Sequence, residues 1–447
     1  MNPLKVFLTA RRSELPLALL MSSYFFIIMM TFWVLKPLKK SLFIRRYDEI
    51  GFDFFSWHMT AAQTEQLAKI LNIAVSLAAV IVFTALARRF HRQQLTFIFT
   101  IFFMAGFVFF AERISDPQST EVFTIWAFYL FGDLFSGLMV ATFFAFLNDS
   151  VSPSAAKRMY GVVGLGGVLG GAAGSMSLRV LIKSLPSEQW MWVCFGMGIV
   201  ILLVAFVAGR VVDSHPEFAP SDEEHRETEA ARKGGLANPA IEGAYLVTRS
   251  GYFLAIAGIV FLYEIASTCM DFQFTSTIEE FRSGEEIGEQ FSTVYLITNS
   301  VAVGVQLLLT SFVMTRFGVG VALLVTPIVA FAGSGAFLVA PVLWVGSLLN
   351  TADNGFNYSI NQSAKESLYV PMKKADKYNG KAFIDLLLQR FAKGVAILVT
   401  LAITREFAEF SRVRWLSVFT MVVILAWMFA SWYVGKRFRE IAEKAEP

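Results

Sequence analysis

The chain has 447 residues, of which 55% are hydrophobic and only 16% are charged, and Phe alone contributes 45 residues. An average soluble domain is about a quarter charged, so this composition excludes an ordinary soluble domain and predicts a membrane protein. The formal net charge of +3 points to no particular partner. Cys194 and Cys269 both lie within apolar runs, so neither a disulfide framework nor a metal–thiolate site is expected.

Apolar runs of about 20 residues are long enough to cross a bilayer as helices. The sequence predicts twelve of them, at 14–38, 66–87, 94–112, 122–147, 158–182, 190–211, 251–274, 289–314, 318–340, 342–361, 380–404 and 414–435. The polar stretch 212–249 separates them and is predicted to be a solvated linker. The expected fold is therefore an all-α membrane protein with two six-helix halves, residues 1–211 and 250–447, an arrangement typical of transporters built from two repeats.

Lys and Arg residues concentrate in alternate loops, which predicts that both termini and the 212–249 linker are cytoplasmic. The first apolar run is longer than a signal-peptide core, so we interpret it as an uncleaved span. The expected location is a bacterial-type inner membrane. The basic stretch 36–46 is an exception to this distribution of Lys and Arg, because it lies at the predicted outer end of the first span. This exception suggests a role other than topology.

Charged residues at membrane depth are costly and are found mostly where they face a water-filled path or a charged ligand. Lys36, Lys39 and Lys40 are spaced so that they share one helical face. Three cations at a helix end could hold a polyphosphate or a polycarboxylate. Snorkelling of these side chains to lipid headgroups is the alternative.

The tenth predicted span carries a stripe of amide side chains at spacings of four, three and four residues, with Asp353 beside it. The stripe consists of Asn350, Asn354, Asn357 and Asn361. It predicts either the wall of a pore or hydrogen bonds between helices.

The eleventh predicted span carries Lys381, Asp385, Gln389 and Lys393 at regular spacings of four, with Arg390 adjacent. Asp385 is expected to pair with Lys381 and to reach Gln389. Lys393 would then lack a partner on its own helix and is a candidate anion ligand.

Three carboxylates also lie in apolar spans. Asp133 and Asp271 could bind a coupling proton or pair with a lysine of the substrate site, and a purely structural role is the alternative. Glu264 precedes Asp271 by seven residues on the same helical face. Lys393 could also pair with Asp133 or Asp271 instead of binding an anion.

The fifth span is rich in glycine, and Gly166, Gly170 and Gly174 form a small-residue face at a spacing of four. No strand precedes these glycines, so a dinucleotide-binding loop is not indicated. Close helix packing or a flexible gating helix fits the pattern better. The sequence shows no catalytic triad, phosphate-binding loop or metal motif. An enzyme is therefore not expected, and neither is a cofactor, a metal or a nucleic-acid partner.

Residues 365–371 (Lys-Glu-Ser-Leu-Tyr-Val-Pro), 380–385 (Gly-Lys-Ala-Phe-Ile-Asp) and 390–393 (Arg-Phe-Ala-Lys) resemble the signature of the ATP/ADP translocase family. These are the nucleotide transporters of plastids and intracellular bacteria, with relatives in free-living bacteria. The family's first-span motif, Leu-Arg-x-x-Lys-Asp, is matched loosely by residues 35–40. Here Lys36 stands in place of the arginine, and Lys40 in place of the aspartate.

The resemblance implies a major-facilitator-like fold and nucleotide exchange. It also implies that Lys39, Lys365 and Lys393 neutralise phosphates, and that Asp133 and Asp271 occupy positions where the family has glutamates. These departures leave another phosphorylated or carboxylated anion open as the substrate.

We therefore expect a transporter that moves an anionic metabolite, with a nucleotide as the first choice, by exchange or uptake through alternating access around a central cavity. The expected substrate-binding residues are Lys36, Lys39, Asn357, Asn361, Lys365, Lys381, Asp385, Arg390 and Lys393, and the expected coupling or charge-pairing residues are Asp133, Glu264 and Asp271. Two alternatives stay open: a proton-coupled transporter of another solute, and a membrane receptor or regulatory module without transport.

The topology can be tested by labelling with a membrane-impermeant thiol reagent. Single cysteines introduced at Ser221, in the linker, and at Ser283, in a loop on the opposite side, should react from opposite faces of the membrane. Reaction of both from the same face would contradict the assignment.

Overall fold

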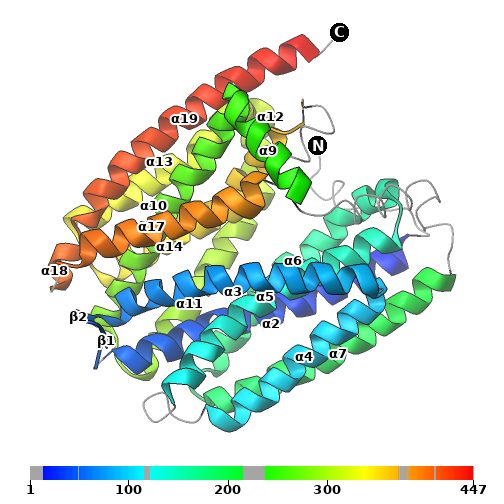
Figure 1. Ribbon diagram of the computed structural model, residues 1–447, viewed down its shortest axis with the longest axis horizontal. Helices are drawn as coiled ribbons and strands as arrows, with labels where there is room; N and C mark the ends of the chain where they lie inside the picture. Colours follow the sequence, from blue (N-terminus) through cyan, green and yellow to red (C-terminus); the bar gives the residue numbers. More distant parts are fainter. Residues whose placement is uncertain are drawn as a thin grey trace. The chain divides into compact units, whose positions relative to one another are not determined.

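A computed structural model describes residues 14–48, 50–114, 121–214, 237–370, 372, 380–381, 383–406 and 409–445 (Figure 1). The chain forms two compact units. Unit 1 consists of Met1–Arg46, Leu71–Gly234 and Gly284–Leu296, and unit 2 of Tyr47–Ile70, Gly235–Ser283 and Ile297–Pro447. The division into two six-helix halves, with boundaries at residues 211 and 250, stays a prediction.

Unit 1 is built from long helices. They are α2 (Leu15–Tyr47), α4 (Arg92–Arg113), α5 (Val122–Ser150), α6 (Pro153–Leu181) and α7 (Ser187–Ser214), with the later part of α3 (Ala61–Arg89) and the first part of α11 (Glu285–Gly304). Helix α4 lies beside α7 and also contacts α5 (Figure 1). Phe103 and Phe107 of α4 pack edge-to-face on Phe131 of α5, with ring centroids 5.3 and 5.4 Å away. This aromatic packing holds the two helices together.

The glycine face of α6 packs directly on α2. A Cβ atom would overlap a backbone carbonyl of α2 at each of three positions: Gly166 against Ser22, Gly170 against Phe26 and Gly174 against Met30. The prediction of close helix packing at this face is therefore confirmed. Small residues allow the two backbones to approach, which is how helices associate where lipid removes the hydrophobic driving force.

Unit 2 contains the remaining elements. They are β1 (Phe52–Phe54), β2 (Trp57–Met59), α9 (Ala237–Arg249), α10 (Gly251–Phe281), α12 (Ser311–Arg316), α13 (Gly318–Val339), α14 (Leu343–Phe356), α15 (Gln362–Ser367), α17 (Gln389–Thr404), α18 (Phe410–Val413) and α19 (Leu416–Ala445), with three π-helical segments, η2 (Val305–Thr310), η3 (Asn357–Asn361) and η4 (Ile384–Leu388). Helix α10 contacts α14, α17 and α19. Of the predicted linker, residues 237–249 form α9, and residues 215–236 lie outside the described residues.

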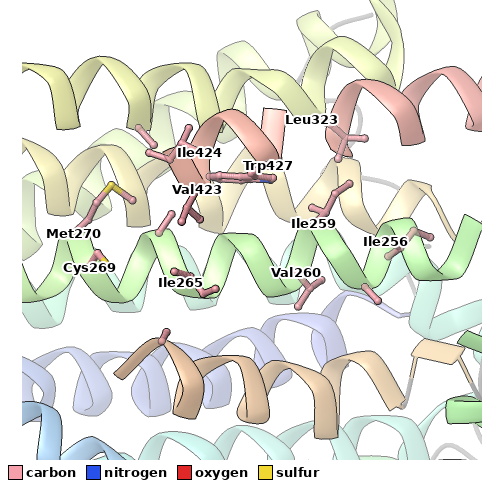
Figure 2. Packing of buried hydrophobic residues seen from close by; sticks show 14 of the residues in the cluster. Ile256, Ile259, Val260, Ile265, Cys269, Met270, Leu323, Val423, Ile424 and Trp427 are labelled. Atoms are coloured by element: carbon pink, nitrogen blue, oxygen red, sulfur yellow. The ribbon is translucent and has the colours of Figure 1, made fainter. Parts of the chain in front are cut away.

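Figure 2 shows the apolar core of unit 2. Ile256, Ile259 and Val260 recur on α10 at helical spacing, and Trp427 of α19 lies within the same buried cluster. The Trp427 ring also meets Tyr263 edge-on, with the ring centroids 5.4 Å apart. Helix α10 therefore forms the centre of unit 2 and fixes the side chains that project from its polar positions.

Among the described residues, ten helices are long and apolar enough to span a membrane, so the chain is a multi-pass membrane protein. The predicted spans 342–361 and 380–404 are helical at their described residues from Leu343 onward, and each contains a π-helical turn. Neither span is among the ten. A total of twelve spans stays a prediction.

Two details differ from the expectation. Helix α2 does not end near residue 38 but continues through Pro37 to Tyr47. Buried residues such as Leu42 and Phe43 stabilise this extension, because packing outweighs the one backbone hydrogen bond that a proline removes. The structure also contains the β1–β2 hairpin, in which Phe54 faces Trp57. Strands of three residues are too short for an alternation of apolar and polar residues to be recognised in the sequence.

The helix α6–α2 contact can be tested with Gly170→Ala. The added Cβ would overlap the carbonyl oxygen of Phe26, and overpacking of this kind costs about 1–3 kcal/mol. The midpoint of thermal unfolding in detergent should therefore fall. Gly164→Ala is the matched control on the same helix, because a Cβ there meets nothing within 4 Å. Equal midpoints for the two variants would contradict the packing described.

Candidate functional site

The basic cluster of unit 1, defined as Lys36, Lys39 and Lys40, lies in the interior of α2. The expectation that it stands at a helix end is corrected, because the helix continues to Tyr47. Lys39 and Lys40 are only 5% and 4% exposed. Snorkelling leaves the ammonium group in water, so this burial argues against the snorkelling interpretation for these two lysines.

Lys39 forms an ion pair with Asp133 of α5. The ammonium also lies over the ring of Tyr129, 4.2 Å from its centroid. Gly132 makes room for the lysine stem, since a Cβ at that position would lie 2.8 Å from Lys39 Cδ. Asp133, which is predicted to take part in coupling or charge pairing, thus lies beside a lysine that is predicted to bind substrate. The Asp133 side chain is 25% exposed, so the pair is partly accessible.

Aromatic rings surround the other two lysines of the basic cluster. Lys36 Nζ lies 4.6 Å from the ring centroid of Trp33 and 5.0 Å from that of Tyr295 on α11. Lys40 Nζ lies 5.3 Å from the ring centroid of Phe291. Ring faces attract cations, so these contacts hold the ammonium groups inside the helical unit.

A cavity of about 350 Å³ lies next to this part of α2. It is lined by side chains of α2, α7 and α11 and of the 182–186 loop: Leu38, Ser41, Arg45, Ile182, Leu185, Pro186, Ser187, Trp190, Glu285 and Gly288. The lysines of the basic cluster are not among its lining residues, so the cavity neighbours the predicted site but does not contain it.

In unit 2, the eleventh predicted span pairs differently from the expected stripe. Lys381 donates to Glu366 at 2.6 Å, and Asp385 lies 3.8 Å from Lys365. Gln389 donates to Glu264 of α10 at 2.7 Å. The physical reason is the π-helical turn η4, which includes Asp385. A π-turn changes the helical repeat, so residues four apart no longer stack on one face.

Lys393 lies on an exposed part of α17 and close enough to Glu264 for the two charges to interact. The alternative partners considered for Lys393 have other lysines beside them, since Asp133 pairs with Lys39 and Asp271 with Lys69. Arg390 is half-buried on the same helix. The structure thus groups Lys393 with Glu264.

The amide stripe of the tenth predicted span is divided by the π-helical turn η3. Asn361 donates through Nδ2 to Asn357 Oδ1 at 2.8 Å, and Asn354 bonds back to the carbonyl of Asn350 at 3.2 Å. Within the part of the chain that the structure describes, Oδ1 of the buried Asn361 has no hydrogen-bond partner. A polar ligand could therefore bond there without displacing a protein group.

Sequence reasoning missed Glu65 and Lys69 of α3. Lys69 lies 3.3 Å from Glu65 and also forms an ion pair with Asp271 of α10. A signal was present, because Glu65 and Lys69 are four residues apart at the start of an apolar span. Among the described residues no group of three or more His, Cys, Asp or Glu could hold a metal ion.

Ion pairs and π-helical turns inside a bundle of membrane-crossing helices are typical of a solute transporter. The chain belongs to the Major Facilitator Superfamily, whose family model matches residues 20–383. A second model, the TLC ATP/ADP transporter, matches residues 335–438, a range that includes the motifs at 365–393. The resemblance to the ATP/ADP translocase family is thereby confirmed, and the chain is a transporter rather than an enzyme.

Curated relatives agree with this family. ADP,ATP carrier protein 1, chloroplastic, of Arabidopsis thaliana is 23% identical over 436 residues, covering 84% of this chain and 68% of that protein. ADP,ATP carrier protein 1 of Chlamydia muridarum is 24% identical, covering 70% and 65%. ADP,ATP carrier protein 5 of Rickettsia felis is 22% identical and covers 94% of both chains. This chain thus matches about two thirds of the length of the first two relatives.

Solved structures show the same fold at low sequence identity. A bacterial homologue of the human lysosomal transporter Spinster, in an inward-facing and unoccupied conformation, has a TM-score of 0.56 at 14% identity, covering 94% of this chain and 98% of that one. A mutant of the nucleoside transporter NupG has a TM-score of 0.59 at 12% identity, covering 95% and 99%.

The Lys69 ion pairs predict which of two variants loses more stability. Lys69→Met removes the cation shared by Glu65 and Asp271, and breaking a buried pair in this way costs about 3–5 kcal/mol. Asp271→Asn leaves Lys69 beside Glu65 and should cost only about 1–2 kcal/mol. The midpoint of thermal unfolding in detergent should fall further for Lys69→Met. The reverse order would show that Lys69 does not link the two carboxylates.

Proposed function

We propose that the protein carries a nucleotide across the cell inner membrane by alternating access, as an ATP/ADP-type exchanger or uptake system. In this proposal the chain crosses the membrane twelve times, in two six-helix halves joined by the 212–249 linker, and both termini are cytoplasmic. The observation that carries the proposal is the match of residues 335–438 to the TLC ATP/ADP transporter model. The names of the three relatives described above, each an ADP,ATP carrier protein, support the same substrate class.

The Lys365–Asp385 pair supports a phosphate-binding role in unit 2. Lys365 Nζ lies 3.8 Å from Asp385 Oδ1, which is beyond hydrogen-bond range. A phosphate oxygen could approach the ammonium to about 2.7–2.9 Å, the distance typical of a charge-assisted bond. The substrate could therefore take over the lysine from a carboxylate that holds it only weakly.

The remaining predicted residues are assigned roles within this proposal. Lys36 and Lys39 of unit 1, with Lys381, Arg390 and Lys393 of unit 2, supply positive charge for phosphate groups. Asn357 and Asn361 bond the neutral part of the ligand, and Asp133, Asp271 and Glu264 balance the lysines when the substrate is absent. Paired lysines avoid the cost of an isolated charge inside the membrane.

Flux measurements test the function. Purified protein in proteoliposomes should take up labelled ATP or ADP, and uptake into vesicles preloaded with unlabelled nucleotide would identify exchange. A receptor or regulatory module without transport predicts no flux of any solute. If another anion is transported and nucleotides are not, the protein is a transporter but its substrate is not a nucleotide.

The phosphate-binding role of Lys365 predicts the effect of Lys365→Gln. A charge-assisted contact is worth about 1.5–3 kcal/mol, so ATP and ADP affinity should fall about 10- to 100-fold. Lys39→Gln and Lys393→Gln should act in the same direction. Lys365→Arg should retain more affinity than Lys365→Gln, because the charge remains.

Binding to the purified protein, compared for ATP, ADP and an unphosphorylated nucleoside, measures the effect. Lys436→Gln on α19 is the matched control, since Lys436 is exposed and has no role in the proposal. Nucleoside binding as tight as that of ATP, or unchanged ATP binding by Lys365→Gln, would remove the phosphate-binding role.

A further inference from the structure

We propose that Asp353 is a proton-binding site that couples transport to a proton gradient. Asp353 lies on α14, four residues before the start of the π-helical turn η3, which continues the same helix. The inference rests on the proposed transport function, because a coupling site needs a substrate to be coupled. It changes the role expected from the sequence, where Asp133 and Asp271 were the candidates for a coupling proton.

The surroundings of Asp353 set it apart from the other carboxylates of the candidate site. Asp133, Asp271 and Asp385 each have a lysine beside them. Asp353 is only 2% exposed, and within the described residues no lysine or arginine forms an ion pair with it. Its Oδ1 is buried and has no hydrogen-bond partner among the described residues. A carboxylate that no cation compensates is costly in such a place, and binding a proton removes that charge.

Ser267 of α10 holds the other carboxyl oxygen. Its hydroxyl donates to Asp353 Oδ2, with an oxygen–oxygen distance of 2.6 Å. A serine hydroxyl can donate or accept, so the same contact persists when Asp353 is protonated and its own O–H donates to Ser267 Oγ. The site therefore accommodates both forms of the carboxyl group without rearranging its neighbours.

Several titratable groups interact with the carboxyl group of Asp353. Helix α10 contributes the carboxylates of Glu264 and Asp271 and the hydroxyl of Tyr263, and η3 contributes Tyr358. Lys393 of α17 interacts with Tyr358 and Glu264. Two of these neighbours are carboxylates, and like charges oppose the ionised form of Asp353. A proton is thus the simplest cation that this buried carboxylate can take.

A metal cation fits the site less well. Hard cations such as Ca²⁺ need six or more oxygen ligands. Among the described residues no group of three or more His, Cys, Asp or Glu could hold a metal ion. We therefore assign the site to a proton, and make a sodium gradient an alternative outcome of the test.

The proton site and the proposed phosphate site are physically connected. Asp353 and Lys365 lie on one continuous helical segment, α14–η3–α15, and their separation of twelve residues corresponds to roughly 18 Å along a helix. Glu264 interacts electrostatically with Asp353 and with Lys365 and Lys393. Loss of the proton from Asp353 would therefore change the electrostatic field at Lys365 and Lys393. The protonated and deprotonated forms would then bind the substrate with different affinities, as coupling requires.

The test compares two modes of nucleotide uptake by Asp353→Asn in proteoliposomes, with the membrane potential held at zero by valinomycin and equal potassium. One mode is accumulation into empty vesicles driven by an imposed pH gradient, and the other is counterflow into vesicles preloaded with nucleotide. With one proton per nucleotide, a gradient of one pH unit should support about a tenfold accumulation in the wild type. Asp353→Asn should lose this accumulation and retain counterflow. Glu440→Gln is the control, since Glu440 forms an exposed pair with Arg437.

Each outcome decides between the two hypotheses. Counterflow without any response to the pH gradient in the wild type would overturn the proton site and leave nucleotide transport intact. Accumulation that follows a sodium gradient instead, or a normal pH response in Asp353→Asn, would also overturn it. No nucleotide flux in either mode would overturn the proposed function, and the proton site would then be decided by spectroscopy.

Infrared difference spectra recorded across a pH change need no substrate. The wild type should show the C=O stretch of a protonated carboxylic acid that Asp353→Asn lacks, and identical spectra would contradict the assignment. If Asp353→Asn does not fold, Ser267→Ala provides a second test. It removes the contact at Oδ2 and should shift the pH profile of gradient-driven uptake while counterflow persists. An unchanged profile would count against the site.

Discussion

The ion pair between Lys39 and Asp133 shows the constraint on which the rest of the structure depends. A charge inside a membrane-spanning bundle is stable only beside a compensating group. Unit 1 meets this constraint by joining α2 to α5, and unit 2 does so by joining α3 to α10 through Lys69 and Asp271. In each unit the charged residues therefore also hold helices together, and any substrate that recruits a lysine must loosen a helix contact.

The sequence was sufficient to locate the ten helices that are long and apolar enough to span a membrane, because apolar run length decides what can cross a bilayer. It was not sufficient to locate their ends. Pro37 and the basic cluster resembled the end of a span, yet α2 continues to Tyr47 because Leu42 and Phe43 are buried by tertiary packing. That packing involves residues far away in the sequence, so the sequence pattern around Pro37 contains no information about it.

The candidate site was predicted in its residue types but not in its pairings. Charged residues in apolar spans are conspicuous, so Asp385 and Glu264 could be singled out, and Lys365 was identified through the motif at 365–371. The partners of Asp385 were inferred from a spacing of four residues, which places side chains together only in a regular α-helix. The π-helical turns at 357–361 and 384–388 break that geometry, and the periodicity of apolar residues does not reveal such turns. Lys69 was missed for another reason, since its partner Asp271 lies on a different helix.

The π-helical turns also distinguish the two units. All three that occur within the described residues belong to unit 2, and π-turns are frequent at functional sites because they re-aim side chains at some cost in helix regularity. The consequence appears in the ion pairs. Lys39 and Asp133 meet in direct contact on regular helices, whereas Lys365 and Asp385 stand 3.8 Å apart beside irregular ones. The looser pair loses less when a phosphate oxygen replaces the carboxylate, so unit 2 is where a substrate can compete most effectively for a lysine.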